Sequence, residues 1–145
     1  MERVKINMPE TYLFSTVIPV RITDINYGGH VGNNAFLGIL HEARMQFLQK
    51  YQCTEMDFFG CGLIMLDAAI NFKKELFYGQ VLTVNVTISS FTRLGFDIFY
   101  QITTTDDKGI TVAAEAKTGM ICFDYQQKKK AAVPAAAIEA FKVLN

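Results

Sequence analysis

The sequence predicts an α+β fold in which one long central helix is wrapped by a curved antiparallel sheet of five to six strands. Several segments alternate apolar and polar residues with the period of two that a strand requires, and one segment, roughly 33–51, repeats apolar residues at the helical spacing. Short turns join the strand-like segments, which is typical of antiparallel neighbours that bury one face.

Five segments read as strands. The first covers 14–23, where Ile22 is expected on the buried face, and the second covers 63–73, where Leu66 is expected to be buried. The polar face of the second strand carries Asp67, Asn71 and Lys73. The other three are expected at 81–90, 95–103 and 110–122. The last two are joined by DDKG, residues whose types favour a tight turn.

The helical segment is apolar over an unusually wide part of its surface. One stripe and its flanks comprise Phe36, Leu37, Ile39, Leu40, Ala43, Phe47, Leu48 and Tyr51. Such a helix is expected to be wrapped by the sheet and not merely laid on it. Asn33 or Asn34 is expected to cap its first turn. A short second helix is expected after Pro134, docked through Ile138 and Phe141.

The composition indicates a single folded domain over residues 1–145. Half of the residues are apolar, and fourteen basic side chains balance fourteen acidic ones, so no net charge attracts nucleic acid or an anionic membrane. No signal-peptide pattern is present, and no apolar run reaches the roughly 20 residues that a membrane span requires. Cys53, Cys61 and Cys122 are odd in number and lack paired spacing, which indicates reduced thiols and a cytoplasmic protein. Neither a metal-binding spacing nor a phosphate loop occurs, so no metal and no cofactor is expected.

The segment DINYGGHVGNNAFL (24–37), followed by HEAR (41–44), joins strand-like to helix-like sequence. With the later segments FKKELFYGQVLTV and FTRLGFDIFYQI, it resembles the hotdog-fold acyl-CoA thioesterases of the 4-hydroxybenzoyl-CoA thioesterase type, over about residues 12–125. The positions that fit the family motif are Gly29, His30, Val31, Asn33, Leu37, Glu42, Ala43 and Arg44. The resemblance implies hydrolysis of an acyl-CoA or acyl-carrier-protein thioester to a free acid and a thiol, with coenzyme A present only as part of the substrate.

Asn26 departs from the family pattern. Asp24 takes the place of the first motif aspartate, but Asn26 takes the place of the second, which is the catalytic carboxylate in many members of the family. This departure favours one alternative, a non-catalytic acyl-CoA-binding module. A second alternative is a hotdog enoyl-CoA hydratase, whose Asp-x-Asn-Pro-x-His motif the segment resembles, although the proline is absent and one residue is inserted.

Thioester hydrolysis needs an activated water and stabilisation of the oxyanion. Backbone N–H groups of Gly29, His30 and Val31, at the positive end of the helix dipole, are expected to stabilise the oxyanion. An asparagine side chain cannot act as a general base, so Asn26 is expected to hold the water or the carbonyl. Histidine titrates near neutral pH, and His30 is the favoured base.

Glu42 is paired with His30 in this hypothesis, because related plant acyl-carrier-protein thioesterases place a catalytic glutamate twelve residues after the motif histidine. Asp24 is expected to orient the group. Each side chain also has a structural interpretation: a hydrogen bond for His30, an ion pair with an arginine for Glu42, and a cap or turn for Asp24.

Substrate contacts are expected from three further residues. Lys73 and Arg93 could meet the phosphates of coenzyme A. In hotdog dimers the strand that corresponds to 63–73 lies near the partner's helix start, so Asp67 has either a polar role across the interface or a place on an exposed strand face. Because an open sheet has two unpaired edges, a homodimer or a dimer of dimers, a homotetramer, is expected.

Overall fold

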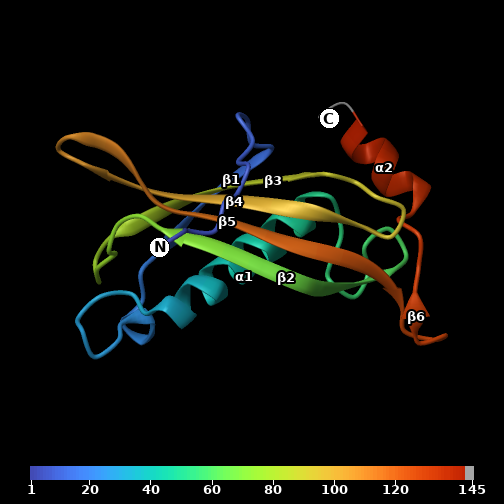
Figure 1. Cartoon of the computed structure of the whole chain (residues 1–145), viewed down its shortest axis with the longest axis horizontal. Helices are drawn as coiled ribbons and strands as arrows, with labels where there is room; N and C mark the ends of the chain where they lie inside the picture. Colours follow the sequence, from blue (N-terminus) through green and yellow to red (C-terminus); the bar gives the residue numbers. More distant parts are fainter. Residues whose placement is uncertain (143–145) are drawn as a thin grey trace.

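The computed structural model describes residues 1–142, which form a six-stranded sheet, a long helix and a short one (Figure 1). The strands are β1 (Phe14–Pro19), β2 (Gly62–Phe72), β3 (Val81–Ser89), β4 (Gly95–Asp106), β5 (Gly109–Asp124) and β6 (Lys129–Lys130). The helices are η1 (Ile22–Asp24, a 3-10 helix), α1 (Asn33–Lys50) and α2 (Ala135–Phe141). The predicted bounds of the long helix, roughly 33–51, are therefore confirmed.

The sheet has the order β1-β3-β4-β5-β2, with the short β6 paired to β5, and every pair of neighbours is antiparallel. β4 and β5 form the predicted hairpin, in which Asp106 pairs with Gly109. Gly109 has φ +110°, a conformation that a residue with a Cβ rarely adopts. Strands β1 and β2 are left at the two edges of the sheet.

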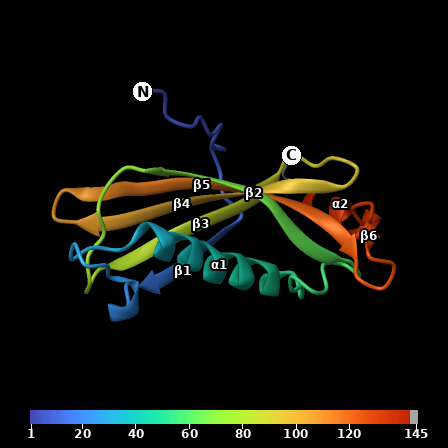
Figure 2. The same cartoon turned by 60° about the horizontal axis from the view of Figure 1, so that its bottom comes forward.

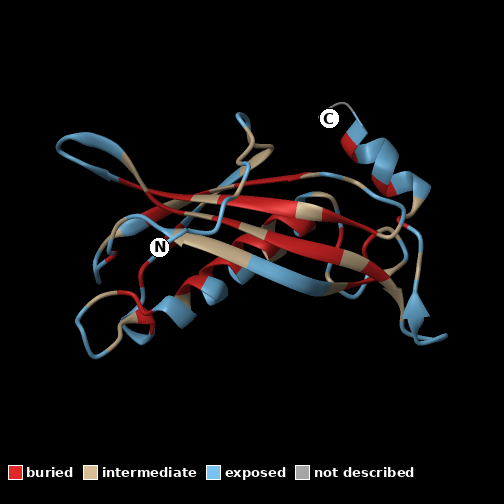
Figure 3. Ribbon diagram, in the orientation of Figure 1, coloured by how far each residue is buried: buried red, intermediate tan, exposed pale blue. Residues whose placement is uncertain are grey.

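α1 lies lengthwise along one face of the curved sheet (Figure 2). Its buried residues are Phe36, Ile39, Leu40, Ala43, Arg44, Phe47 and Leu48. The predicted apolar stripe is thus confirmed, but the wrapping is partial. Leu37 is 46% exposed, and the side of α1 away from the sheet is open along its length (Figure 3).

The first strand is shorter than predicted. β1 ends at Pro19, and Ile22 lies in η1 with 66% of its surface exposed, so its predicted burial is wrong. The carboxylate of Asp24 accepts the backbone N–H of Arg21 at 2.8 Å, which closes the chain into this single helical turn. The hydrogen bond from Arg21 to the Asp24 side chain therefore favours a helical turn at residues 22–24, where the sequence predicted the end of the strand.

The predicted face of the second strand is also wrong at Leu66, which is 60% exposed. Met65 pairs with Met120 while Asp67 pairs with Gly119, so Leu66 has no counterpart on β5 and forms a bulge. A bulge of one residue reverses the alternation of side chains along a strand. As a result Leu63 and Met65, and not Ile64 and Leu66, share the face of β2 that is turned toward α1.

α2 docks as predicted through Phe141, which is fully buried, although Ile138 is 46% exposed. The ring of Phe141 packs against Phe47 and Tyr51 from the carboxyl-terminal part of α1. No helix within residues 1–142 is long and apolar enough to cross a membrane. The three cysteines are free thiols, and burial raises the pKa of each of them.

Candidate active site

The segment between η1 and α1 forms a tight loop closed by its own hydrogen bonds. Ile25 and Val31 form an isolated β-bridge, and the backbone N–H of Asn26 donates to His30 O at 2.9 Å. The side-chain oxygen of Asn26 accepts the N–H of Gly28 at 2.9 Å, an Asx turn. The loop therefore holds His30 directly beside the start of α1.

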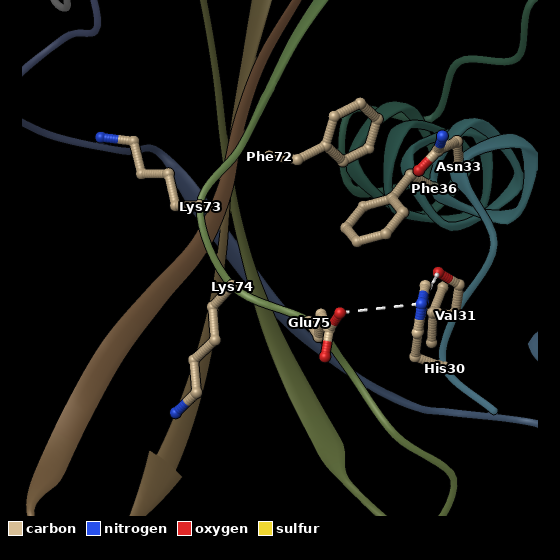
Figure 4. A pocket seen from close by; sticks show the side chains of 8 residues that line it. All are labelled: His30, Val31, Asn33, Phe36, Phe72, Lys73, Lys74 and Glu75. Atoms are coloured by element: carbon tan, nitrogen blue, oxygen red, sulfur yellow. Dashed lines mark hydrogen bonds and ion pairs between the residues drawn. The ribbon is translucent and has the colours of Figure 1, made fainter. Parts of the chain in front are cut away.

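A cavity of about 220 Å³ opens at this end of α1 (Figure 4). His30, Val31, Asn33 and Phe36 line one side, and residues 72–75, which end β2 and begin its connection to β3, line the other. The rings of Phe36 and Phe72 meet edge to face with their centroids 4.9 Å apart. The cavity therefore combines an aromatic wall with polar groups.

The imidazole of His30 is held from both sides and is 31% exposed. Its Nδ1 lies 3.3 Å from Val31 O, and because a carbonyl oxygen only accepts, Nδ1 carries the proton. Its Nε2 faces the carboxylate of Glu75 across the cavity, at 3.7 Å from Oε1 (Figure 4). The imidazole therefore presents Nε2 to the carboxylate of Glu75 and Nδ1 to the carbonyl of Val31.

Two of the three backbone donors predicted for the oxyanion, those of Gly29 and Val31, are already used, whereas that of His30 stays a prediction. The N–H of Gly29 donates to Asn26 O and that of Val31 donates to Leu76 O at 2.8 Å, so these two groups already have acceptors. Gly32 occupies the N-cap position of α1 without a side-chain cap, and the predicted capping by Asn33 or Asn34 is wrong because both are already helical. The N–H of Asn33 is one of the groups that a helix leaves without an internal partner, and Asn33 lines the cavity.

The predicted pairing of His30 with Glu42 does not form within the chain. Glu42 lies nine residues after Asn33 on α1, about 13 Å along the helix axis, and lines a different groove together with Arg21. Its carboxylate accepts a hydrogen bond from Gln46 at 2.8 Å. Glu42 is therefore separated from the cavity that contains His30.

Asp24 is buried and fully engaged by Arg21. Its carboxylate accepts the Arg21 backbone N–H and pairs with the guanidinium at 3.1 Å. The hydrogen bond and the charge of Asp24 raise the pKa of Arg21. Asp24 therefore caps η1, which is the structural alternative given for it above. It does not orient His30, as the catalytic hypothesis expected.

The three predicted substrate contacts lie in separate places. Lys73 is at the cavity but pairs with Glu115 at 2.6 Å, and its side chain points away from His30 (Figure 4). Asp67 lies on the outer face of the sheet, where a hydrogen bond from Lys117 at 2.8 Å lowers its pKa. Arg93 precedes β4 at the Leu63 end of β2, whereas the cavity is at the Phe72 end, about 30 Å along the strand.

Glu75 was missed by the sequence reasoning. It lies three residues after the end of β2, in a family-like segment that does not mark it as a site residue, and only the fold brings it to His30. The one signal in the sequence was its neighbour Leu76. An apolar residue directly after three charged ones indicates that the turn packs against the core, and Leu76 is indeed fully buried.

A long helix along a curved antiparallel sheet, with a polar cavity at the amino end of the helix, is the hotdog arrangement of the thioesterases. A model of the Thioesterase-like superfamily matches residues 20–141, so the chain belongs to that superfamily.

The chain is similar to the 1,4-dihydroxy-2-naphthoyl-CoA hydrolase of Nostoc punctiforme, with 27% identity over 118 residues that cover 79% of this chain and 77% of the relative. Among solved structures, the 1,4-dihydroxy-2-naphthoyl-CoA thioesterase from Synechocystis superposes with a TM-score of 0.78 at 27% identity, covering 90% of this chain and 96% of that one. The 4-hydroxybenzoyl CoA thioesterase from Pseudomonas shares the fold, with a TM-score of 0.75 at 18% identity over 89% and 99% of the two chains.

Proposed function

We propose that this protein is an acyl-CoA thioesterase that hydrolyses its substrate in the cavity at the start of α1. One observation carries the proposal: His30 and Asn33, the first residue of α1, line the same cavity. The backbone N–H of Asn33 is one of the donors that a helix leaves without an internal acceptor. Membership in the thioesterase-like superfamily and the names of the relatives support hydrolysis of a CoA thioester.

In this proposal the thioester carbonyl lies against the amino end of α1. The N–H of Asn33 donates to the carbonyl oxygen, and the positive end of the helix dipole stabilises the negative charge that develops there. Nε2 of His30, whose Nδ1 faces the carbonyl of Val31, accepts the proton of the attacking water. No cofactor is required, because coenzyme A enters and leaves as part of the substrate.

We extend the proposal to an aromatic acyl group. The edge-to-face pair of Phe36 and Phe72 lies in the cavity beside His30, and aromatic rings stack favourably in such a setting. The relatives from Nostoc punctiforme and Synechocystis are both named for 1,4-dihydroxy-2-naphthoyl-CoA. Lys73, at the rim of the cavity, is proposed to release Glu115 and bind a phosphate of coenzyme A.

Asn26 is proposed to stand where the family's usual catalytic aspartate would be. Its side-chain oxygen is used by the Asx turn with Gly28, so the amide shapes the loop that presents His30. The same substitution favours the alternative function, an acyl-CoA-binding module without turnover. The two functions can be distinguished by one measurement, because a thioesterase releases a free thiol and a binding module does not.

The protein is further proposed to act in the cytoplasm as a homodimer or homotetramer. The edge strand β2 supports association, since Leu66 is 60% exposed and Met65 is 41% exposed on it. No strand within residues 1–142 pairs with its outer edge. Asp67 and Arg93 lie far from the cavity of their own chain. In such an oligomer they could contribute to binding only by contacting the substrate held in the cavity of a partner subunit.

The proposal is tested by measuring thiol release from a panel of aliphatic and aromatic acyl-CoA substrates. Turnover of at least one thioester is expected, with aromatic substrates preferred. His30→Ala is expected to reduce kcat by about 100-fold or more, because it removes the general base. Tight binding of acyl-CoA without thiol release from any substrate would instead support the binding module.

A further inference from the structure

We propose that Glu75 is a catalytic residue that works with His30 on the attacking water. The inference rests on the proposed thioesterase function and deepens it, because it names the carboxylate that the chain uses in the absence of one at position 26. Glu75 Oε1 lies 3.7 Å from His30 Nε2, and both line the same cavity (Figure 4).

The separation of the two atoms fits a shared water. At 3.7 Å the two groups are slightly too far apart for a direct hydrogen bond, but one water can lie about 2.8 Å from each and donate one hydrogen to each. Both of its hydrogens are then directed at acceptors, so a lone pair on its oxygen is free for attack. His30 accepts through Nε2, because Nδ1 donates to Val31 O.

The position of Glu75 is held by the fold. The next residue, Leu76, is fully buried, and its carbonyl accepts the N–H of Val31 at 2.8 Å. This bond ties the turn after β2 to the loop that carries His30, one residue from each of the two side chains. The juxtaposition of Glu75 and His30 is therefore set by backbone pairing and core packing as well as by their charges.

No other carboxylate of the described residues lines this cavity. Asp24 is buried against Arg21, and Glu42 lies in a separate groove. The lysines that accompany Glu75 have carboxylates of their own, since Lys73 pairs with Glu115 and Lys74 with Asp106. The carboxylate of Glu75 is thus left to face His30.

The proposed reaction proceeds in two steps. The water oxygen forms a bond to the carbonyl carbon, its proton passes to His30 Nε2, and the carbonyl electron pair moves to the oxygen at the Asn33 N–H. The negative charge of Glu75 stabilises the imidazolium that results. The C=O bond then re-forms, the C–S bond breaks, and the departing sulfur takes the proton from His30, which gives the acid and the thiol.

Glu75→Gln tests the inference directly, because it keeps an oxygen at the site and removes the charge. The side chain is 64% exposed, so the variant is expected to fold with an unchanged melting temperature. We expect kcat to fall by about 10- to 100-fold with KM changed by less than about threefold. Glu139→Gln, which removes a 76%-exposed carboxylate on α2, provides the matched control and is expected to retain wild-type kcat.

The double variant His30→Ala/Glu75→Gln separates joint action from two independent effects. If both groups act on one water, the double variant is expected to be no slower than His30→Ala alone, within about threefold. A wild-type kcat for Glu75→Gln, or losses that multiply in the double variant, would overturn the role of Glu75 and leave the thioesterase function standing. Absence of thiol release by the wild-type protein would overturn both.

Discussion

The guanidinium of Arg44 and the hydroxyl of Tyr100 meet inside the protein, with Nη1 and the phenolic oxygen 3.1 Å apart. Arg44 is almost completely buried, and its Nε donates to the carboxylate of Glu55 at 2.8 Å. Tyr100 in turn shares a 2.8 Å hydrogen bond with Thr118. The arginine of the HEAR segment therefore crosses from α1 to the sheet and joins them by a buried polar network.

Arg44→Met is expected to lower the free energy of unfolding by about 3 kcal/mol, because Glu55 and Tyr100 lose a buried charged partner. Tyr100→Phe keeps the pair of Arg44 with Glu55 and is expected to cost only about 1 kcal/mol. Urea unfolding at neutral pH measures both. A loss below 0.5 kcal/mol for Arg44→Met, a threshold set by the usual scatter of surface substitutions, would show that the network adds little to stability.

Gly28→Ala is expected to reduce activity without unfolding the protein. An added Cβ would lie 3.2 Å from both His30 Nε2 and the side-chain oxygen of Asn26, so the imidazole has to move. A displacement well below 1 Å in a reacting group is expected to reduce kcat/KM by about 10-fold.

Gly38→Ala is the control for this substitution. Gly38 is in the middle of α1, and apart from the adjoining helix no described residue lies within 4 Å of a Cβ added there. It is expected to keep wild-type kcat/KM and to raise the free energy of unfolding by about 0.5–1 kcal/mol, since alanine favours a helix over glycine. Equal kcat/KM values for the two variants would mean that His30 tolerates the added methyl group.

The parts of the fold that depend on local pattern could be predicted from the sequence. The helix was expected at about 33–51 and spans Asn33–Lys50, because its apolar spacing is a property of the segment itself. The hairpin at 106–109 was also predicted, since glycine and aspartate favour that turn wherever it lies.

The parts that depend on pairing between distant segments could not be predicted. The bulge at Leu66 exists only because β5 offers no counterpart to that residue. His30 and Glu75 are forty-five residues apart in the sequence, and the backbone bond from Val31 to Leu76 brings them together. The expected partner of His30, Glu42, came from a family spacing, and the rise of α1 places it more than two turns away.

In Asp67→Asn, the free energy of unfolding is expected to fall less steeply between neutral and acid pH than it does in the wild type. The hydrogen bond from Lys117 lowers the pKa of Asp67 below its ordinary value near 3.8, so the carboxylate stabilises the fold above that pH. This contribution is lost as pH falls through the lowered pKa of the folded state. Because Asp67 is 62% exposed, solvent screening limits the effect to under about 1 kcal/mol.

Urea unfolding of wild type and Asp67→Asn at neutral pH and near pH 2 measures this contribution. The wild type is expected to be the more stable at neutral pH, and the two proteins are expected to converge near pH 2. A difference that is unchanged at acid pH would mean that Asp67 acts through packing or its hydrogen bond to Gly119, and not through its charge.

Leu66→Lys is expected to convert the proposed oligomer to a folded monomer. Leu66 lies in the bulge of the edge strand β2 and is 60% exposed, so a lysine there adds charge where another copy of the strand would pair and removes little from the core of its own chain. Ile110→Lys is the control, because Ile110 is equally apolar, 76% exposed and at the β4–β5 hairpin.

Sedimentation is expected to give a mass near 16.3 kDa for Leu66→Lys and a multiple of it for wild type and Ile110→Lys. A wild-type protein that already sediments as one chain, or an oligomer that survives in Leu66→Lys, would contradict association through this edge of β2.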